Sequence, residues 1–117
     1  MCGIDWAAGL FAGEGHAGIS EKSGRIELNA SIGMLDHAAI ERFAAIVRAT
    51  IPKDRVFKKK GSVAVSYNEH IKGGIFARIH LGGEYAEYVL NAILPSLEGT
   101  QKGEQIKIAI KKWKGGT

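Results

Sequence analysis

The chain has 117 residues, of which 45% are hydrophobic and 24% are charged. These proportions are typical of one globular domain and disfavour a disordered or fibrous protein. Sixteen basic residues against twelve acidic ones give a net charge of +4, which suits a polyanionic partner without requiring one. The only cysteine, Cys2, excludes an internal disulfide and a cysteine-based zinc site, and it favours a reducing compartment.

No segment has the features of a membrane anchor or a secretion signal. A bilayer-spanning helix needs about 18 apolar residues in succession, and no run in the sequence approaches that length. The sequence also lacks the basic-then-apolar leader of a signal peptide. We therefore expect an intracellular protein with no membrane partner, and the sequence does not distinguish the cytoplasm from an organelle.

A short helix is predicted over residues 5–14, with Asp5 as its N-cap and Gly15 as its stop. Glycine inside a helix costs about 1 kcal/mol relative to alanine, so its presence on two turns indicates a packing role. Small side chains let two helix backbones approach closely. We expect this helix to pack against the same helix of a second copy, through Ala8, Gly9, Ala12 and Gly13.

The next segments predict a hairpin and a second helix. Strands are expected over residues 16–22 and 25–33, joined at Ser23-Gly24. Polar and apolar residues alternate along both strands, so one face of the hairpin is polar. Asp36 is predicted to cap a helix that ends before Pro52.

The second half of the chain repeats this layout and adds a helix. A long or broken strand is predicted over residues 56–67 and another over 75–81, followed by helices over 84–97 and 103–114. Hairpins joined by helices favour an antiparallel sheet with helices on one face. The sequence thus predicts a single α+β domain spanning residues 1–117.

A glycine pattern of the dinucleotide-binding type occurs between Gly13 and Gly18. That pattern binds a pyrophosphate only where it follows a strand and opens a helix. Here a helix precedes it and a strand follows, so we do not assign a nucleotide site.

Glu14 stands in the last turn of the first predicted helix, where the helix dipole disfavours a negative charge. A single glutamate at such a position is most simply a solvated surface residue. If two copies of the helix pack together, however, their two carboxylates meet and repel unless a cation bridges them. Magnesium prefers carboxylate oxygen ligands of this kind.

Mixed hydrogen-bond donors and acceptors with a basic excess occupy the polar face of the predicted strands. Such a face suits base edges and phosphates in a DNA groove, although antiparallel sheets often leave one face in water. The predicted DNA-binding set, called the strand-face set below, consists of His16, Ser20, Lys22, Arg25, Glu27, Asn29, Ser31, Lys58, Lys60, Arg78 and His80.

Four segments in succession resemble one known family. Residues 6–15 read WAAGLFAGEG and resemble the signature of the LAGLIDADG homing endonucleases. The segments 39–43 with 46–47, 93–97 and 101–105 resemble the family as well, in the expected order and over nearly the whole chain.

The resemblance implies an αββαββα fold whose antiparallel, saddle-shaped sheet lies on DNA and is covered by helices on one face. In this family the signature helices pack against each other, and the acid that ends each helix binds the catalytic divalent metal, here Mg²⁺. A chain with one signature resembles the homodimeric members. A symmetric dimer requires a long, roughly palindromic site in double-stranded DNA.

Carried over to this chain, the resemblance assigns metal binding and catalysis to Glu14. Lys102 matches the basic residue that lies near the scissile phosphate, at the end of a loop about two residues longer than usual. Met34 stands where many members have a glutamine at the end of the second strand. Whether Met34 impairs cleavage is left open by the sequence.

The expected function is therefore double-strand cleavage of DNA by a metal-dependent, homodimeric endonuclease, as encoded in introns. The alternative is a non-cleaving binder on the same fold, either a DNA-binding regulator or an intron maturase that binds RNA. A third possibility, independent of the resemblance, is a small scaffold or ligand-binding α+β domain.

Overall fold

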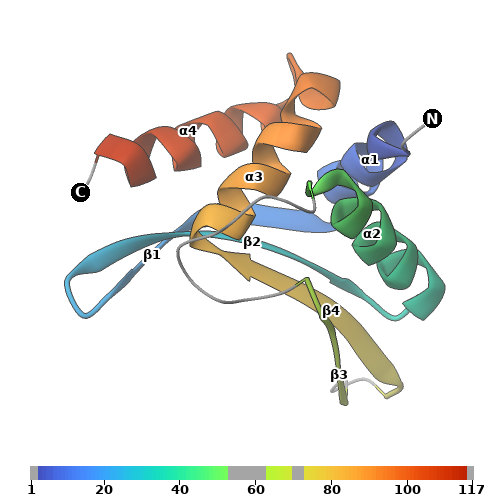
Figure 1. Cartoon of the computed structure of the whole chain (residues 1–117). Helices are drawn as coiled ribbons and strands as arrows, with labels where there is room; N and C mark the ends of the chain where they lie inside the picture. The colour runs from blue at the N-terminus through green and yellow to red at the C-terminus, as the bar shows by residue number, and fades with distance from the viewer. Residues whose placement is uncertain (1–2, 53–62, 70–72, 116–117) are drawn as a thin grey trace.

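The structure is a computed structural model that describes residues 3–52, 63–69 and 73–115. It has the predicted α+β class, with an antiparallel sheet and helices on one of its faces (Figure 1). The elements in chain order are α1 (Ile4–Glu14), β1 (Gly15–Lys22), β2 (Arg25–Met34), α2 (His37–Thr50), β3 (Val65–Glu69), β4 (Ile75–Gly82), α3 (Gly83–Ile93), the 3₁₀ helix η1 (Leu94–Leu97) and α4 (Gln101–Gly115).

The four strands form one sheet in the order β1-β2-β4-β3, and every neighbouring pair is antiparallel. The β1-β2 turn has positive φ at Ser23 (54°) and Gly24 (78°), which is the backbone that tight two-residue hairpins require. Both outer hairpins bend away from the helices, so the sheet is arched and its uncovered face is concave (Figure 1). We call this uncovered face the outer face.

The core lies between the sheet and the helices. Along β2 the alternate residues Leu28, Ala30 and Ile32 are buried, as the alternating pattern predicts. Above them Phe11 of α1 stacks on Phe43 of α2, with ring centroids 6.4 Å apart. Each large side chain buried in this way contributes about 1.5–3 kcal/mol to folding, so the core fixes α1 firmly on the sheet.

The start of α1 differs from the prediction. The helix begins at Ile4, and Gly3 occupies the cap position with a φ of 68°. Asp5 is therefore not the N-cap; it lies in the first turn and accepts a hydrogen bond from Ser96 Oγ (2.5 Å). The predicted cap Asp36 is confirmed, since its side chain accepts from the Ala39 amide (3.2 Å).

The last helices also begin and end at other residues than predicted. The α-helix α3 stops at Ile93, because Pro95 lacks an amide hydrogen and cannot continue the helical ladder. The predicted single helix over 84–97 is thus an α-helix followed by η1. The final helix, predicted over 103–114, begins two residues earlier, at Gln101. It is an element more than the αββαββα order that the resemblance implies.

Candidate functional site

The first feature of the site is the abrupt passage from α1 into β1. Glu14 is the last residue of α1 and is exposed, and Gly15 is already extended, with φ −86° and ψ 163°. A Cβ on Gly15 would lie 2.4 Å from the buried Phe11 ring, so only glycine fits there without movement of the core. The turn at Gly15 thereby places Glu14 at the corner where the helix meets the sheet.

The second feature is the arrival of α4 at the same corner. Lys102, in the first turn of α4, donates a hydrogen bond from Nζ to the Gly15 carbonyl oxygen (2.8 Å). The two residues are 87 positions apart in the sequence, and the acceptor Gly15 directly follows Glu14. An ammonium group at the negative end of a helix dipole is favourable by about 0.3–1 kcal/mol. The structure therefore brings the two predicted catalytic residues to one corner of the fold, which we call the Glu14 corner.

The sheet register places polar side chains in a row beside this corner. His16 of β1 is paired with Ser31 of β2, and Ser31 is paired with His80 of β4. All three belong to the alternation opposite the buried residues, so they lie on the outer face. Two imidazoles and a hydroxyl thus line one transverse row of the sheet.

Further polar groups extend along the β1-β2 hairpin. Asn29 donates from Nδ2 to Ser20 Oγ (2.6 Å), and Ser20 is paired in register with Glu27. Lys22 is paired with Arg25 at the end of the hairpin. The hydrogen bond between Asn29 and Ser20 restricts the rotamers of these two side chains on the outer face.

The strand-face set is brought together wherever the structure describes it. The set members that lie on the outer face are His16, Ser20, Arg25, Glu27, Asn29, Ser31, Arg78 and His80, with Lys22 at a matching register position. Lys58 and Lys60 lie outside the described residues. The predicted alternation thus accounts for the whole described part of the set.

Phe76 also lies on this face, as the alternation of residues 75–81 predicts, although the strand-face set does not include it. Its ring lies across β2 at Gly33, where an added Cβ would come within 2.4 Å of Phe76 Cε1. Arg78 is paired with Gly33 in register, so Phe76 and Arg78 both flank Gly33 on the outer face. The signal in the sequence is the alternation of β4, which places Phe76 on the same face as Arg78 and His80.

The small-residue stripe of α1 is only partly available to a partner. Gly9 and Gly13 are exposed, and a Cβ on either would meet nothing within 4 Å. Ala12 is half-buried. Ala8 is 1% exposed because it packs into the core of its own chain, so it leaves almost no surface for the predicted contact with a partner helix.

A single chain does not build a metal cage at the Glu14 corner. Among the described residues, no group of three or more His, Cys, Asp and Glu side chains could hold a metal ion. Magnesium in proteins is often held by one or two carboxylates together with substrate phosphates and water. The exposed carboxylate of Glu14 is a donor of the right type, so a magnesium site fits here once a second carboxylate or a phosphate is supplied.

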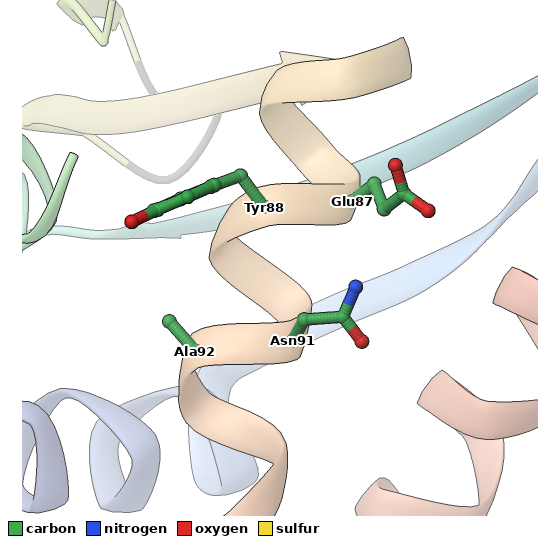
Figure 2. A pocket seen from close by; sticks show the side chains of 4 residues that line it. All are labelled: Glu87, Tyr88, Asn91 and Ala92. Atoms are coloured by element: carbon green, nitrogen blue, oxygen red, sulfur yellow. The ribbon is translucent and has the colours of Figure 1, made fainter. Parts of the chain in front are cut away.

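The helix side of the molecule offers a different kind of surface. A shallow recess of about 410 Å³ runs along α3 and is lined by Glu87, Tyr88, Asn91 and Ala92 (Figure 2). Glu87 is ion-paired with Lys114 of α4 (2.8 Å), and the Tyr88 hydroxyl donates to the carbonyl of Thr50 (3.0 Å). These contacts tie α3 to its neighbouring helices, and the recess contains none of the predicted site residues.

Comparisons with known proteins add no assignment. No protein-family model matches the sequence, and no curated protein matches it. In the described parts of the chain, no helix has both the length and the apolar character needed to cross a membrane.

Proposed function

We propose that this chain is a magnesium-dependent DNA endonuclease that cleaves both strands of a long, roughly palindromic site as a homodimer. The contact that carries this proposal is the hydrogen bond from Lys102 Nζ to the Gly15 carbonyl, 2.8 Å long, beside Glu14. It holds an ammonium group at the carbonyl of the residue that follows Glu14, at the start of an edge strand of a concave polar sheet. The resemblance to the LAGLIDADG homing endonucleases supports the same assignment.

The outer face has the chemistry for DNA recognition. Guanidinium groups such as Arg25 and Arg78 suit phosphates and guanine edges, whereas Asn29 suits adenine. The exposed Arg78 and His80 lie close to the middle of the sheet, on a strand with neighbours on both sides. A duplex seated along the concave face would meet base-reading groups near the centre and basic groups towards the hairpin tip.

Dimerisation through α1 would complete the site. Gly9 and Gly13 leave the outward side of α1 bare, so a second α1 helix could approach to backbone contact. A two-fold axis beside this stripe would bring the two Glu14 carboxylates close together at the centre of the duplex. Each chain would then act on one strand, which gives a double-strand break.

The chain's own residues have distinct tasks in this scheme. The two Glu14 carboxylates would hold Mg²⁺, which when bound supplies the Lewis acidity that activates water and stabilises the leaving oxygen. Lys102 would transfer its hydrogen bond from the Gly15 carbonyl to a non-bridging oxygen of the scissile phosphate. Its ammonium group would thereby stabilise the negative charge that develops on that phosphate.

A cleavage selection tests the proposal. Purified protein is incubated with a randomised library of palindromic duplexes in Mg²⁺, and the cut ends are captured and sequenced. We expect related palindromic sites to be enriched, and the same incubation with a chelator in place of Mg²⁺ to give no enrichment. Binding of library DNA without any magnesium-dependent cutting would contradict the proposal.

That contrary result would favour the alternative of a non-cleaving binder of DNA or RNA. Met34 keeps this alternative open, because it stands where the resemblance implies a glutamine and its apolar side chain packs against the core. It therefore offers no polar group to a metal or a water. A binder of this kind would have a salt-dependent affinity for nucleic acid and would leave both strands intact.

A further inference from the structure

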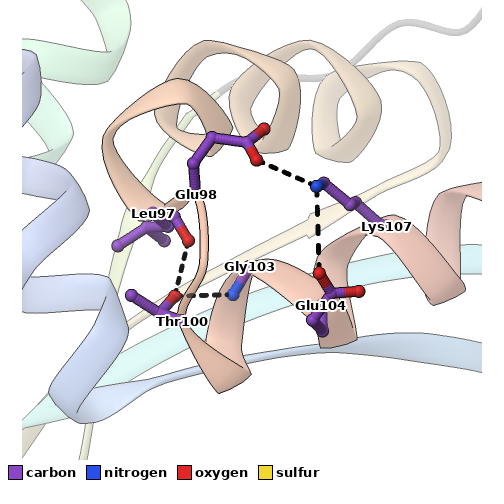
Figure 3. A network of polar contacts seen from close by, with 6 residues as sticks. All are labelled: Leu97, Glu98, Thr100, Gly103, Glu104 and Lys107. Carbon is purple, nitrogen blue, oxygen red and sulfur yellow. Dashed lines mark hydrogen bonds and ion pairs between the residues drawn. The ribbon is translucent and has the colours of Figure 1, made fainter.

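The segment between η1 and α4 is wound into a tight polar turn (Figure 3). Thr100 is its centre: its Oγ1 donates to the Leu97 carbonyl (2.6 Å) and accepts from the Gly103 amide (3.0 Å). The Thr100 amide donates to the same Leu97 carbonyl (3.1 Å). The threonine hydroxyl therefore holds the first turn of α4 against the last turn of η1.

Gly103 makes this close approach possible. It is buried, and a Cβ at this residue would lie 2.2 Å from the Leu97 carbonyl oxygen and 3.1 Å from its carbon. The first distance is far inside van der Waals contact, and the atom met is backbone rather than a mobile side chain. Leu97 is itself only 4% exposed, so the turn of η1 cannot move aside without disturbing the core.

A solvent-side ion pair spans the same turn. Lys107 Nζ lies 3.0 Å from Glu98 Oε2 and 3.9 Å from Glu104 Oε1 (Figure 3). Such exposed pairs contribute little to stability. The position of the turn is therefore set mainly by the threonine hydroxyl and by the absence of a side chain at Gly103.

Lys102 lies between Thr100 and Gly103 in the sequence. Its backbone belongs to the first turn of α4, and its side chain reaches the Gly15 carbonyl oxygen, which lies 2.8 Å from Lys102 Nζ. An added methyl group at Gly103 must push the start of α4 away from η1. The Lys102 ammonium would then leave the Glu14 corner.

We propose that Gly103 and Thr100 are positioning residues that hold the Lys102 ammonium at the Glu14 corner. The geometric part of this proposal is independent of the reaction, whereas its catalytic consequence rests on the proposed endonuclease function. The absence of a side chain at Gly103 thus allows the backbone packing that places the ammonium group of the preceding residue, Lys102.

The geometric part is tested by NMR on the full chain. The carbonyl carbon shift of Gly15 reports whether that oxygen accepts a hydrogen bond, and Lys102→Met gives the value without the donor. We expect Gly103→Ala and Thr100→Val to move the shift to the Lys102→Met value. Thr100→Ser keeps the hydroxyl, and Gly115→Ala adds a methyl in open space on the same helix, so both should retain the wild-type shift. A wild-type shift in Gly103→Ala would overturn the proposal.

The catalytic consequence is tested by single-turnover cleavage of a selected site. A displacement of about 1 Å can reduce a rate by roughly 100-fold, so we expect a loss of that size in Gly103→Ala with DNA affinity unchanged. In the Lys102→Met background the same substitution should cause no further loss. Additive losses would indicate a merely structural role and overturn the positioning role.

Failure of the proposed function is distinguishable from failure of this inference. If wild-type protein cuts no DNA, the endonuclease proposal fails while the NMR shifts still decide the geometric part. If wild-type protein cuts and Gly103→Ala cuts equally fast, only the positioning role fails.

Discussion

Two glycines shape the Glu14 corner at the scale of single residues. Gly15 lets the chain turn from helix to strand against the Phe11 ring, and Gly103 lets α4 start against the Leu97 carbonyl. Neither glycine has a positive φ, so the requirement at both is space rather than backbone conformation. Each stands directly beside a residue to which we assign chemistry.

Gly15→Ala is expected to destabilise the fold. The new methyl group would overlap the Phe11 ring, which is 1% exposed and stacked on Phe43, so the ring has no free volume to enter. Overpacking of this kind costs about 1–3 kcal/mol. Urea unfolding of the variant measures this loss, with Gly115→Ala as the matched substitution in open space. Equal unfolding midpoints for the two variants would contradict the packing at Gly15.

Some residue roles could be predicted and others could not. The Asp36 cap is readable because the side chain acts on the amide three residues ahead. The role of Asp5 is not, because its partner Ser96 is 91 positions away. Burial of Ala8 depends in the same way on which side of α1 meets the core. The Lys102 contact with Gly15 is long-range too, and the sequence did not predict it; the family resemblance placed Lys102 only near the scissile phosphate.

At the scale of elements, a tyrosine links β3 to α2. Tyr67 donates from its hydroxyl to Glu41 Oε2 (2.5 Å), and its ring meets His37 edge-on, 5.2 Å between centroids. Because the hydrogen bond to Glu41 is lost on ionisation, the pKa of Tyr67 is raised above its ordinary value of 10.0. The nearby carboxylate charge and desolvation act in the same direction.

Glu41→Gln is therefore expected to lower the pKa of Tyr67 towards 10.0. The folded protein holds this proton more tightly than the unfolded chain does. The contact's contribution to stability is thus fully present below pH 10 and is lost as the pH rises through the folded pKa. Ultraviolet titration of the phenolate measures the shift, and Tyr67→Phe identifies which transition belongs to this residue. An unchanged titration curve in Glu41→Gln would contradict the contact.

Element boundaries followed the sequence where local chemistry sets them. Buried and more exposed residues alternate along strand β2 as the sequence predicts, and the Ser23-Gly24 turn has the expected hairpin conformation. The division of the predicted 84–97 helix follows from Pro95, whose effect is local and was available in the sequence. The early start of α4 at Gln101 depends on Thr100 bonding to Leu97, a contact made only once η1 has formed.

At the scale of the whole molecule, two surfaces are left without a covering element in the described chain. One is the concave outer face of the sheet (Figure 1). The other is the exposed part of the small-residue stripe of α1, at Gly9 and Gly13. The α+β class and the polar face follow from periodicity alone. The meeting of the α1 and α4 ends does not, because it depends on how the helices pack over the sheet.

Gly13→Leu is expected to weaken the dimer without unfolding the monomer. A side chain at Gly13, in the last turn of α1, meets nothing within 4 Å in its own chain, and leucine has a higher helix propensity than glycine. In a dimer packed along this stripe, the same side chain would separate the two helices. An overpacking cost of about 1–3 kcal/mol weakens association roughly 5- to 150-fold.

Analytical ultracentrifugation over a concentration series measures this effect, and far-ultraviolet circular dichroism verifies the fold. Asn91→Leu, on the exposed side of α3, serves as the matched control for adding a leucine to a helix surface. Equal association of Gly13→Leu and wild type would contradict dimerisation through α1.

The central claim, that Glu14 carries the cleavage chemistry, is tested most directly by comparing DNA binding and cutting in Glu14→Gln. The substitution keeps the shape of an exposed side chain and removes its charge, and Glu69→Gln makes the same change at an exposed residue of β3. With a selected duplex in Mg²⁺, we predict that Glu14→Gln binds as wild type does and cuts neither strand, while Glu69→Gln cuts normally. Magnesium-dependent cleavage by Glu14→Gln at the wild-type rate would contradict the account.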